Sequence, residues 1–150
     1  MDGSIAMAEG IFGRCPSCLK NMIQGICSFS CSPYHWKFVN ILKTETNPIS
    51  LREYVTSIEV RIAESYINET YDSCKGVIHP SSGRRAMDIA CGAYDSRTCT
   101  PERWHYYMGE PSINPLVPFQ IVYTLSDNPN DRFDTNTTKA CNESYDVRIP

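Results

Sequence analysis

The sequence has no apolar run of the length that a membrane-spanning helix needs. Such a helix takes roughly 18 or more consecutive apolar residues, whereas the longest apolar stretch, residues 116–125, is interrupted by Pro118 and Gln120. Residues 1–13 also lack the basic start and the continuous apolar block of a signal peptide. We therefore expect neither a membrane helix nor a secretory leader within these residues.

An excess of basic residues is missing as well. Lys and Arg number 14 against 17 Asp and Glu, which gives a formal net charge of −3. Nucleic-acid binders normally carry a basic patch or stripe, and membrane-surface helices are rich in Lys and Arg, so the charge balance argues against both classes. With 41% hydrophobic residues in 150, the chain has enough apolar side chains for the core of one domain.

Signatures of catalysis are also absent. His35, His79 and His105 are scattered and form no HExxH pattern, and there is no GxSxG elbow or glycine-rich phosphate loop. No cysteine lies in a recognisable nucleophile signature, and no acidic pair stands out as a general acid and base. We expect no enzyme, no catalytic residue and no cofactor, and we expect the histidines to be surface or partly buried side chains.

What the sequence does have is cysteine, eight in 150 residues. Disulfides persist in the secretory lumen and outside cells, whereas cytosolic thiols stay reduced. Three Asn-x-Ser/Thr sequons, at Asn68, Asn136 and Asn142, are an independent signal of the same compartment. Together they favour a lumenal or extracellular domain. Because no leader is found, they also predict that the chain is a fragment of a longer protein.

Four cysteines follow one another as Cys15-x2-Cys18-x8-Cys27-x3-Cys31. A zinc site would need four thiolates about 2.3 Å from one ion. The apolar spacing and Pro16 predict a helix from Pro16 to about Ser30, which separates Cys18 from Cys27 by roughly 13 Å. We therefore favour structural disulfides over zinc and over a redox CxxC motif, and we expect no metal.

The rest of the pattern alternates helices with a few short strands. Further helices are expected at residues 4–12 and 63–74, after a cap at Ser81 or Ser82, and from Thr100-Pro101 onward. Strands are expected at residues 37–44, 58–62 and 116–125, with a helix through residues 58–66 as the alternative to the second strand. An exposed, glycosylated loop should follow Ser126. The fold class is α+β: a mostly helical, disulfide-rich domain with a small mixed β-sheet.

Several motifs recur in one order along the chain. They are Cys15-Pro-Ser-Cys18, Asn21, Cys27-x3-Cys31-Ser-Pro33, Tyr71-Asp-Ser-Cys74, Pro80-Ser-Ser82, Cys91-Gly92, Trp104-x2-Tyr107-Met108, Pro118-Phe119-x-Ile121 and Asn136-Thr-Thr-Lys-x-Cys141. In this order they closely resemble the lumenal N-terminal domain of Niemann–Pick C1 proteins, from Arg14 to about Ser144. Cysteines, tryptophan, prolines and a sequon in a fixed order make the resemblance specific.

The resemblance implies a sterol-binding and transfer module of a membrane-embedded intracellular sterol transporter. Its ligand would be cholesterol or a related sterol, received from a small soluble lumenal carrier of the Niemann–Pick C2 type and passed to the rest of the transporter, with no nucleic-acid partner. The parent would be a polytopic membrane protein, with this domain on the lumenal side of the late endosome or lysosome membrane. The alternative location is the extracellular face of the plasma membrane.

The resemblance also implies roles for individual residues. The wall of the sterol pocket would include Leu19, Ile26, Met108, Pro118, Phe119 and Ile121. Ile89 and Ala90 match the family's paired leucines at the pocket mouth, where the carrier docks. Since Ala90 is much smaller than leucine, we expect a docking surface that is altered or that depends less on this position.

The cysteine pairing of the family carries over only in part. Cys18–Cys74 and Cys91–Cys99 match internal family disulfides, whereas the partners implied for Cys15, Cys27, Cys31 and Cys141 fall outside residues 1–150. The family's hydroxyl-binding residues lie before the cysteine helix, on elements that we expect this segment to lack. Residues 1–150 would thus be a partial domain, missing its N-terminal elements and its C-terminal cysteine segment, and would bind sterol weakly or not at all.

A second hypothesis is a disulfide-rich lumenal or extracellular interaction module without sterol binding. The two hypotheses differ in whether the apolar residues enclose a dry cavity of several hundred Å³.

Overall fold

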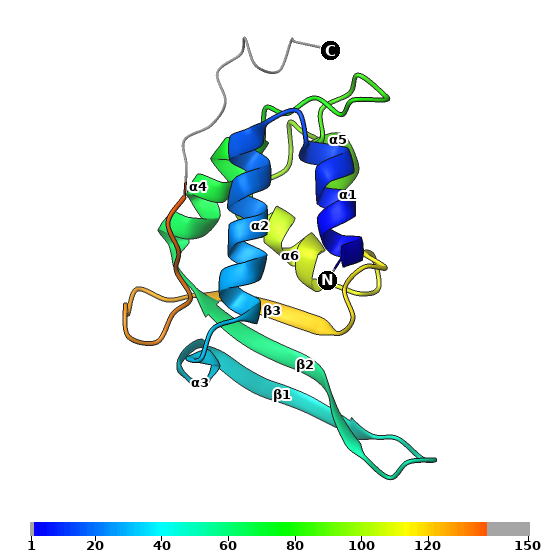
Figure 1. The fold of residues 1–150 in the computed structure, drawn as a ribbon, viewed down its shortest axis with the longest axis vertical. Helices are drawn as coiled ribbons and strands as arrows, with labels where there is room; N and C mark the ends of the chain where they lie inside the picture. Colours follow the sequence, from blue (N-terminus) through cyan, green and yellow to red (C-terminus); the bar gives the residue numbers. More distant parts are fainter. Residues whose placement is uncertain (1, 138–150) are drawn as a thin grey trace.

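Six helices and one three-stranded sheet make up residues 2–137, the part of the chain that the computed structural model describes (Figure 1). The helices are α1 (Asp2–Phe12), α2 (Pro16–Ser30), α3 (His35–Phe38), α4 (Glu64–Cys74), α5 (Met87–Ala90) and α6 (Pro101–Gly109). The strands are β1 (Val39–Thr46), β2 (Glu53–Ile62) and β3 (Gln120–Leu125). This composition confirms the predicted α+β class.

The sheet has the order β1-β2-β3 and is mixed. β1 and β2 are antiparallel and joined by a short turn, whereas β2 and β3 are parallel. A parallel pair needs a long crossover, and here residues 63–119 supply it with α4, α5 and α6. The alternating Ile58, Val60 and Ile62 are all buried, so the strand interpretation of residues 58–62 is confirmed over the helical one.

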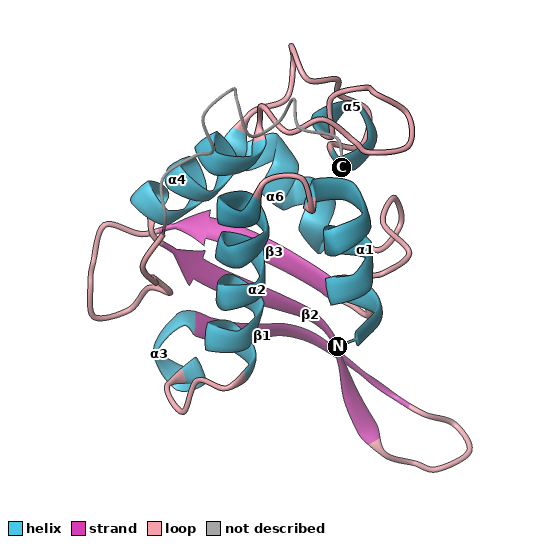
Figure 2. Cartoon of the chain, turned by 45° about the horizontal axis from the view of Figure 1, so that its top comes forward, coloured by secondary structure: helices cyan, strands magenta, loops and turns pink. Residues whose placement is uncertain are grey.

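The hairpin of β1 and β2 extends beyond the helices (Figures 1 and 2). All of β1 after Val39 is exposed, and Ile49 and Leu51 in the turn are 93% and 78% exposed. Asn47 Oδ1 accepts hydrogen bonds from the backbone N–H groups of Ile49 and Ser50, which fixes the turn.

Helix boundaries follow the capping signals wherever those signals are complete. α2 begins at Pro16 after Cys15, whose side chain accepts from the Cys18 N–H, and it ends at Ser30 as predicted. α6 begins at Pro101, with the Thr100 hydroxyl accepting a bond from the Arg103 N–H at 3.2 Å.

Several predicted elements differ from the structure in part: the strand expected at residues 116–125, for example, begins only at Gln120. No helix begins at Ser81 or Ser82, because Gly83 takes a left-handed φ of +68° and the segment turns back. Of the helix expected in this region, only the four residues of α5 are helical. The strand expected from Lys37 starts at Val39 instead. Residues 35–38 form a helical turn that buries Phe38 against Phe29, with ring centroids 5.8 Å apart.

The core divides into two clusters of buried side chains. One gathers around Phe12, Trp104 and the disulfide cysteines, and the other contains Val60, Tyr66 and Phe133. Phe133 corrects the expectation of an exposed loop after Ser126. Its side chain is 7% exposed, and its N–H donates to the Arg61 carbonyl at 2.7 Å, so this segment is tied to the end of β2.

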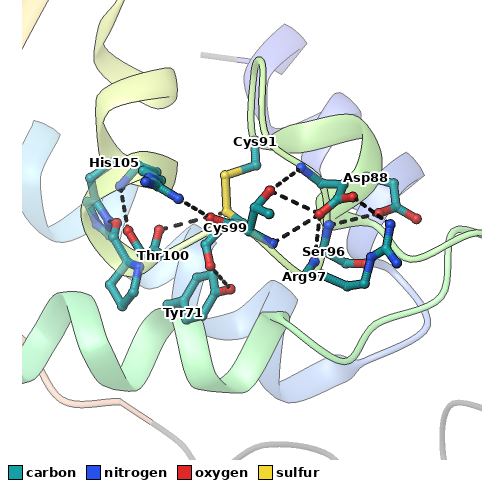
Figure 3. The surroundings of a disulfide bond; sticks show 12 residues. Tyr71, Asp88, Cys91, Ser96, Arg97, Cys99, Thr100 and His105 are labelled. Carbon is teal, nitrogen blue, oxygen red and sulfur yellow. Dashed lines mark hydrogen bonds and ion pairs between the residues drawn. A yellow bond between two sulfur atoms is a disulfide. The ribbon is translucent and has the colours of Figure 1, made fainter.

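Both internal disulfides implied by the resemblance are present, Cys18–Cys74 and Cys91–Cys99. Beside the second one, the Tyr71 hydroxyl of α4 donates to the Cys99 carbonyl at 3.0 Å (Figure 3). The first joins α2 to α4, and the second closes the loop between α5 and α6.

The remaining cysteines behave differently from one another. Cys15 is itself disulfide-bonded and fully buried, so the expectation that its partner lies outside residues 1–150 is wrong. That expectation rested only on the disulfide pattern of the family, from which this chain departs at Cys15. Cys27 and Cys31 are free and exposed near the end of α2. That their partners lie outside residues 1–150 remains a prediction. Cys141 lies outside the described residues.

Candidate functional site

A cavity of about 410 Å³ that is partly open to solvent lies between the helices and the sheet. Its wall comes from α1, α2, β2, α4, α5, α6, β3, the loop at residues 114–119 and Phe133. Elements far apart in the sequence therefore meet around one space, whose volume lies in the range typical of small-molecule sites, about 300–1,000 Å³.

The wall is predominantly apolar and uncharged. Trp104, Met22 and Val60 are typical contributors, and the described residues that line the cavity include no Asp, Glu, Lys or Arg. Water gains few hydrogen bonds in such a space, while an apolar ligand that enters it removes surface from water at roughly 25 cal/mol per Å². The geometry fits a large, uncharged, mostly apolar molecule.

Five of the six residues expected in the pocket wall line this cavity. They are Ile26 from α2, Met108 from α6, Pro118 and Phe119 from the loop before β3, and Ile121 from β3. Their role in sterol binding stays a prediction.

Leu19, the sixth, is not among the lining residues. On α2 the residues that line the cavity all follow Leu19: they are Met22, Gly25, Ile26, Phe29 and Ser30. Leu19 sits one residue after Cys18, in the part of α2 that the disulfide ties to α4.

The two residues expected at the pocket mouth have different environments. Ala90 is 4% exposed and lines the cavity, whereas Ile89 is 40% exposed. The short helix α5 thus presents one side chain to the cavity and its neighbour to solvent.

The wall also contains polar side chains that were not predicted from the sequence: Tyr66, Thr70, His105 and Tyr123. Tyr66 and Thr70 lie one turn apart on α4, and the rings of His105 and Tyr123 meet edge to face with centroids 5.3 Å apart. Helical spacing placed Thr70 on the buried face of its helix, but spacing does not distinguish a core position from one that faces a cavity.

Burial keeps these groups uncharged near neutral pH. It raises the pKa of Tyr123 and of Tyr66, while the nearby Thr70 hydroxyl opposes the rise for Tyr66. Burial also lowers the pKa of His105 to about 4, although its Nδ1 donates to the Pro101 carbonyl at 2.9 Å. The site can therefore donate and accept hydrogen bonds without carrying charge.

Gly25 has a definite role beside this group. A Cβ at this position would lie 2.1 Å from the Tyr66 hydroxyl oxygen. Glycine costs a helix about 1 kcal/mol relative to alanine, and here it makes room for the tyrosine hydroxyl against α2.

His105 also makes stability depend on pH, because it is 4% exposed rather than partly exposed as expected. An unfolded histidine has a pKa near 6.5, so between that pH and the folded pKa of about 4 the unfolded chain binds a proton that the folded one excludes. The free energy of unfolding should therefore fall by about 2 kcal/mol from pH 6.5 to pH 5. Denaturant unfolding at pH 7 and pH 5 tests this, and His105→Phe should remove most of the fall. Equal falls in both proteins would contradict the assignment.

The described residues hold no candidate metal centre and no membrane span. No group of three or more His, Cys, Asp or Glu side chains within them is arranged to hold an ion. None of their helices combines the length and the apolarity that crossing a bilayer requires. Of the sequons, Asn136 is exposed and Asn68 half-buried, and Asn142 lies outside the described residues.

Comparison with known proteins shows the family of the chain. The family described as "Niemann-Pick C1 N terminus" matches residues 1–149. The chain belongs to this family. A Drosophila melanogaster relative, "NPC intracellular cholesterol transporter 1 homolog 1b", is 35% identical over 97% of the chain, and the Sus scrofa "NPC intracellular cholesterol transporter 1" is 33% identical over 89%. The Homo sapiens "NPC1-like intracellular cholesterol transporter 1" is 28% identical over 83%.

The Niemann–Pick C1 relatives are much longer than this chain. The matched segment covers 12% of the Drosophila protein, 11% of the Sus scrofa protein and 9% of the Homo sapiens protein. All three are named as cholesterol transporters and none as an enzyme.

Proposed function

We propose that this chain is the sterol-binding and transfer module of a membrane-embedded sterol transporter, with cholesterol or a related sterol as its ligand. The observation that carries the proposal is the uncharged cavity of about 410 Å³ whose wall includes Ile26, Met108 and Phe119. No bond is made or broken in this function. Binding rests on burial of apolar surface, with a few polar groups setting the orientation of the ligand.

The surroundings of the module follow from the same proposal. The two disulfides and the sequons at Asn68 and Asn136 support a lumenal site, on the late endosome or lysosome membrane. A small soluble carrier of the Niemann–Pick C2 type would deliver sterol near α5, where Ile89 is exposed. The rest of the transporter would receive it.

The cavity weighs against the alternative of an interaction module without sterol binding. A domain whose apolar residues served only a structural core would pack them closely, with few voids larger than a water molecule. The same cavity also argues against the expectation that residues 1–150 bind sterol weakly or not at all. Because this chain supplies both an apolar wall and polar lining groups of its own, we expect measurable binding.

Equilibrium binding of radiolabelled cholesterol to the purified chain, expressed through an oxidising secretory route, tests the proposal. We expect saturable binding near one sterol per chain, reduced by competing unlabelled sterol. Binding that never saturates, or no binding by a chain whose disulfides are formed, would refute it.

A further inference from the structure

A second cavity, of about 320 Å³, lies between α4, α6, β3 and the end of β2. Its apolar wall includes Ile67 of α4 and Val122 and Leu125 of β3. The volume is within the range typical of small-molecule sites, about 300–1,000 Å³. The proposed sterol function makes no use of this space.

α6 presents different residues to the two cavities. Trp104 and Met108 line only the cavity proposed for sterol, whereas Tyr106 and Gly109 line only the second one. Helix residues three or four positions apart share a face, so the two cavities meet different faces of α6. At Gly109 the helix lies directly against β3, where the Ile121 carbonyl leaves no room for a Cβ.

His105 lines both cavities and is 4% exposed. Its Nδ1 lies 2.9 Å from the Pro101 carbonyl oxygen. Because a carbonyl only accepts, Nδ1 carries the hydrogen, and Nε2 of the neutral ring carries a lone pair. Nε2 has no hydrogen-bond partner among the described residues. His105 is therefore a buried acceptor whose capacity the protein leaves unused.

The charges in this wall are of one sign. The described residues that line the second cavity include two carboxylates, Glu102 and Glu110, and no Lys or Arg. Hydrogen bonds from the Ser112 hydroxyl and the Gln120 amide hold the pKa of Glu110 below its usual value, so this carboxylate stays ionised. Glu102 is exposed at the rim and makes no hydrogen bond or ion pair within residues 2–137. The protein supplies no cation to match this charge in the wall.

We propose that the second cavity binds a small amphipathic amine, with its ammonium group at Glu102 and His105 and its apolar body against Val122 and Leu125. A carboxylate and a lone-pair nitrogen both accept hydrogen bonds, and an ammonium group supplies only donors. A neutral alcohol leaves the carboxylate charge unmatched, and an anionic ligand is repelled by it. The site does not depend on sterol binding.

2-Phenylethylammonium is a suitable probe, with 2-phenylethanol as its neutral counterpart and 3-phenylpropionate as its anionic one. In a chemical-shift titration of the ¹⁵N-labelled chain, we expect saturable shifts at the amides of Tyr106, Val122 and Leu125. The amine should bind about fivefold more tightly than the alcohol, as expected for an ion pair at a solvent-exposed rim, and the acid should not saturate. Equal affinities for amine and alcohol, no binding of the amine, or shifts confined to Met22 and Ile26 would overturn the proposal.

Glu102→Gln locates the charge. It should bring the affinity ratio of amine to alcohol to within about twofold of unity, without weakening the alcohol. Glu64→Gln is the matched control, because Glu64 is also an exposed acidic residue in the first turn of a helix and lines neither cavity. Equal changes in the two variants would show an effect of overall charge and would refute the site.

Val122→Phe locates the apolar part of the site. The larger ring occupies the second cavity and should weaken the amine and the alcohol alike, by about fivefold or more. Thr124→Phe is the control, since Thr124 lies on the same face of β3 two residues later and lines neither cavity. Unchanged binding in Val122→Phe would place the probe elsewhere and contradict the proposal.

Discussion

Replacing both cysteines of the Cys18–Cys74 disulfide with alanine should lower the free energy of unfolding by about 4 kcal/mol. The two residues are 56 positions apart, and a cross-link that closes so long a loop removes much of the conformational entropy of the unfolded chain. For a domain whose total stability is about 5–15 kcal/mol, this is a large fraction. Denaturant unfolding of Cys18→Ala/Cys74→Ala beside the unmodified chain measures it.

The second disulfide provides the matched control. Cys91 and Cys99 are 8 positions apart, and the same loop-closure argument gives about 2.5 kcal/mol for Cys91→Ala/Cys99→Ala. The order of the two losses is the informative result. A smaller loss for Cys18→Ala/Cys74→Ala than for the control pair would show that loop closure does not govern the stability of this domain.

Substituting Ile26→Trp should weaken cholesterol binding by about tenfold to a hundredfold. Ile26 is half-buried on α2 and faces the cavity, so the larger ring occupies volume that the ligand needs. Forcing extra atoms into a filled space costs about 1–3 kcal/mol, which corresponds to that range of affinity. In the unliganded chain the cavity accommodates the ring, so the fold should be retained. Cholesterol binding together with circular dichroism of the variant measures both effects.

The control for this experiment is Ile23→Trp. Ile23 is the same residue on the same helix and is also half-buried, but it does not line the cavity. It should bind cholesterol within about twofold of the unmodified chain, since surface substitutions away from a site have small effects. Equal loss in the two variants would indicate a general effect of α2 on binding rather than occupation of the cavity.

Much of the fold could be predicted because the decisive signals are local. α2 and α6 each begin with a proline after a capping residue, and β2 alternates apolar with polar side chains over Ile58–Ile62. α3 and the position of Phe133 could not be predicted in this way. Phe38 and Phe133 are buried against each other, with ring centroids 5.5 Å apart, and that contact joins segments far apart in the sequence.

The candidate site, like the fold, could be predicted from the sequence only in part. Wall positions such as Ile26 and Phe119 follow from the family resemblance, and the structure brings them to one cavity. The polar residues do not follow from it, since a tyrosine or threonine on the buried face of a helix matches an ordinary core position by periodicity. Only the three-dimensional arrangement shows that Tyr66 and Thr70 line a cavity.

The most direct test of the central claim is photo-crosslinking with a cholesterol analogue that carries a photoreactive group, followed by mapping of the labelled residues by mass spectrometry. If the cavity is the sterol site, label should appear on peptides containing Ile26, Met108 and Phe119 and should be removed by excess unlabelled cholesterol. Label confined to the exposed β1–β2 hairpin, or label that competitor does not displace, would contradict the claim.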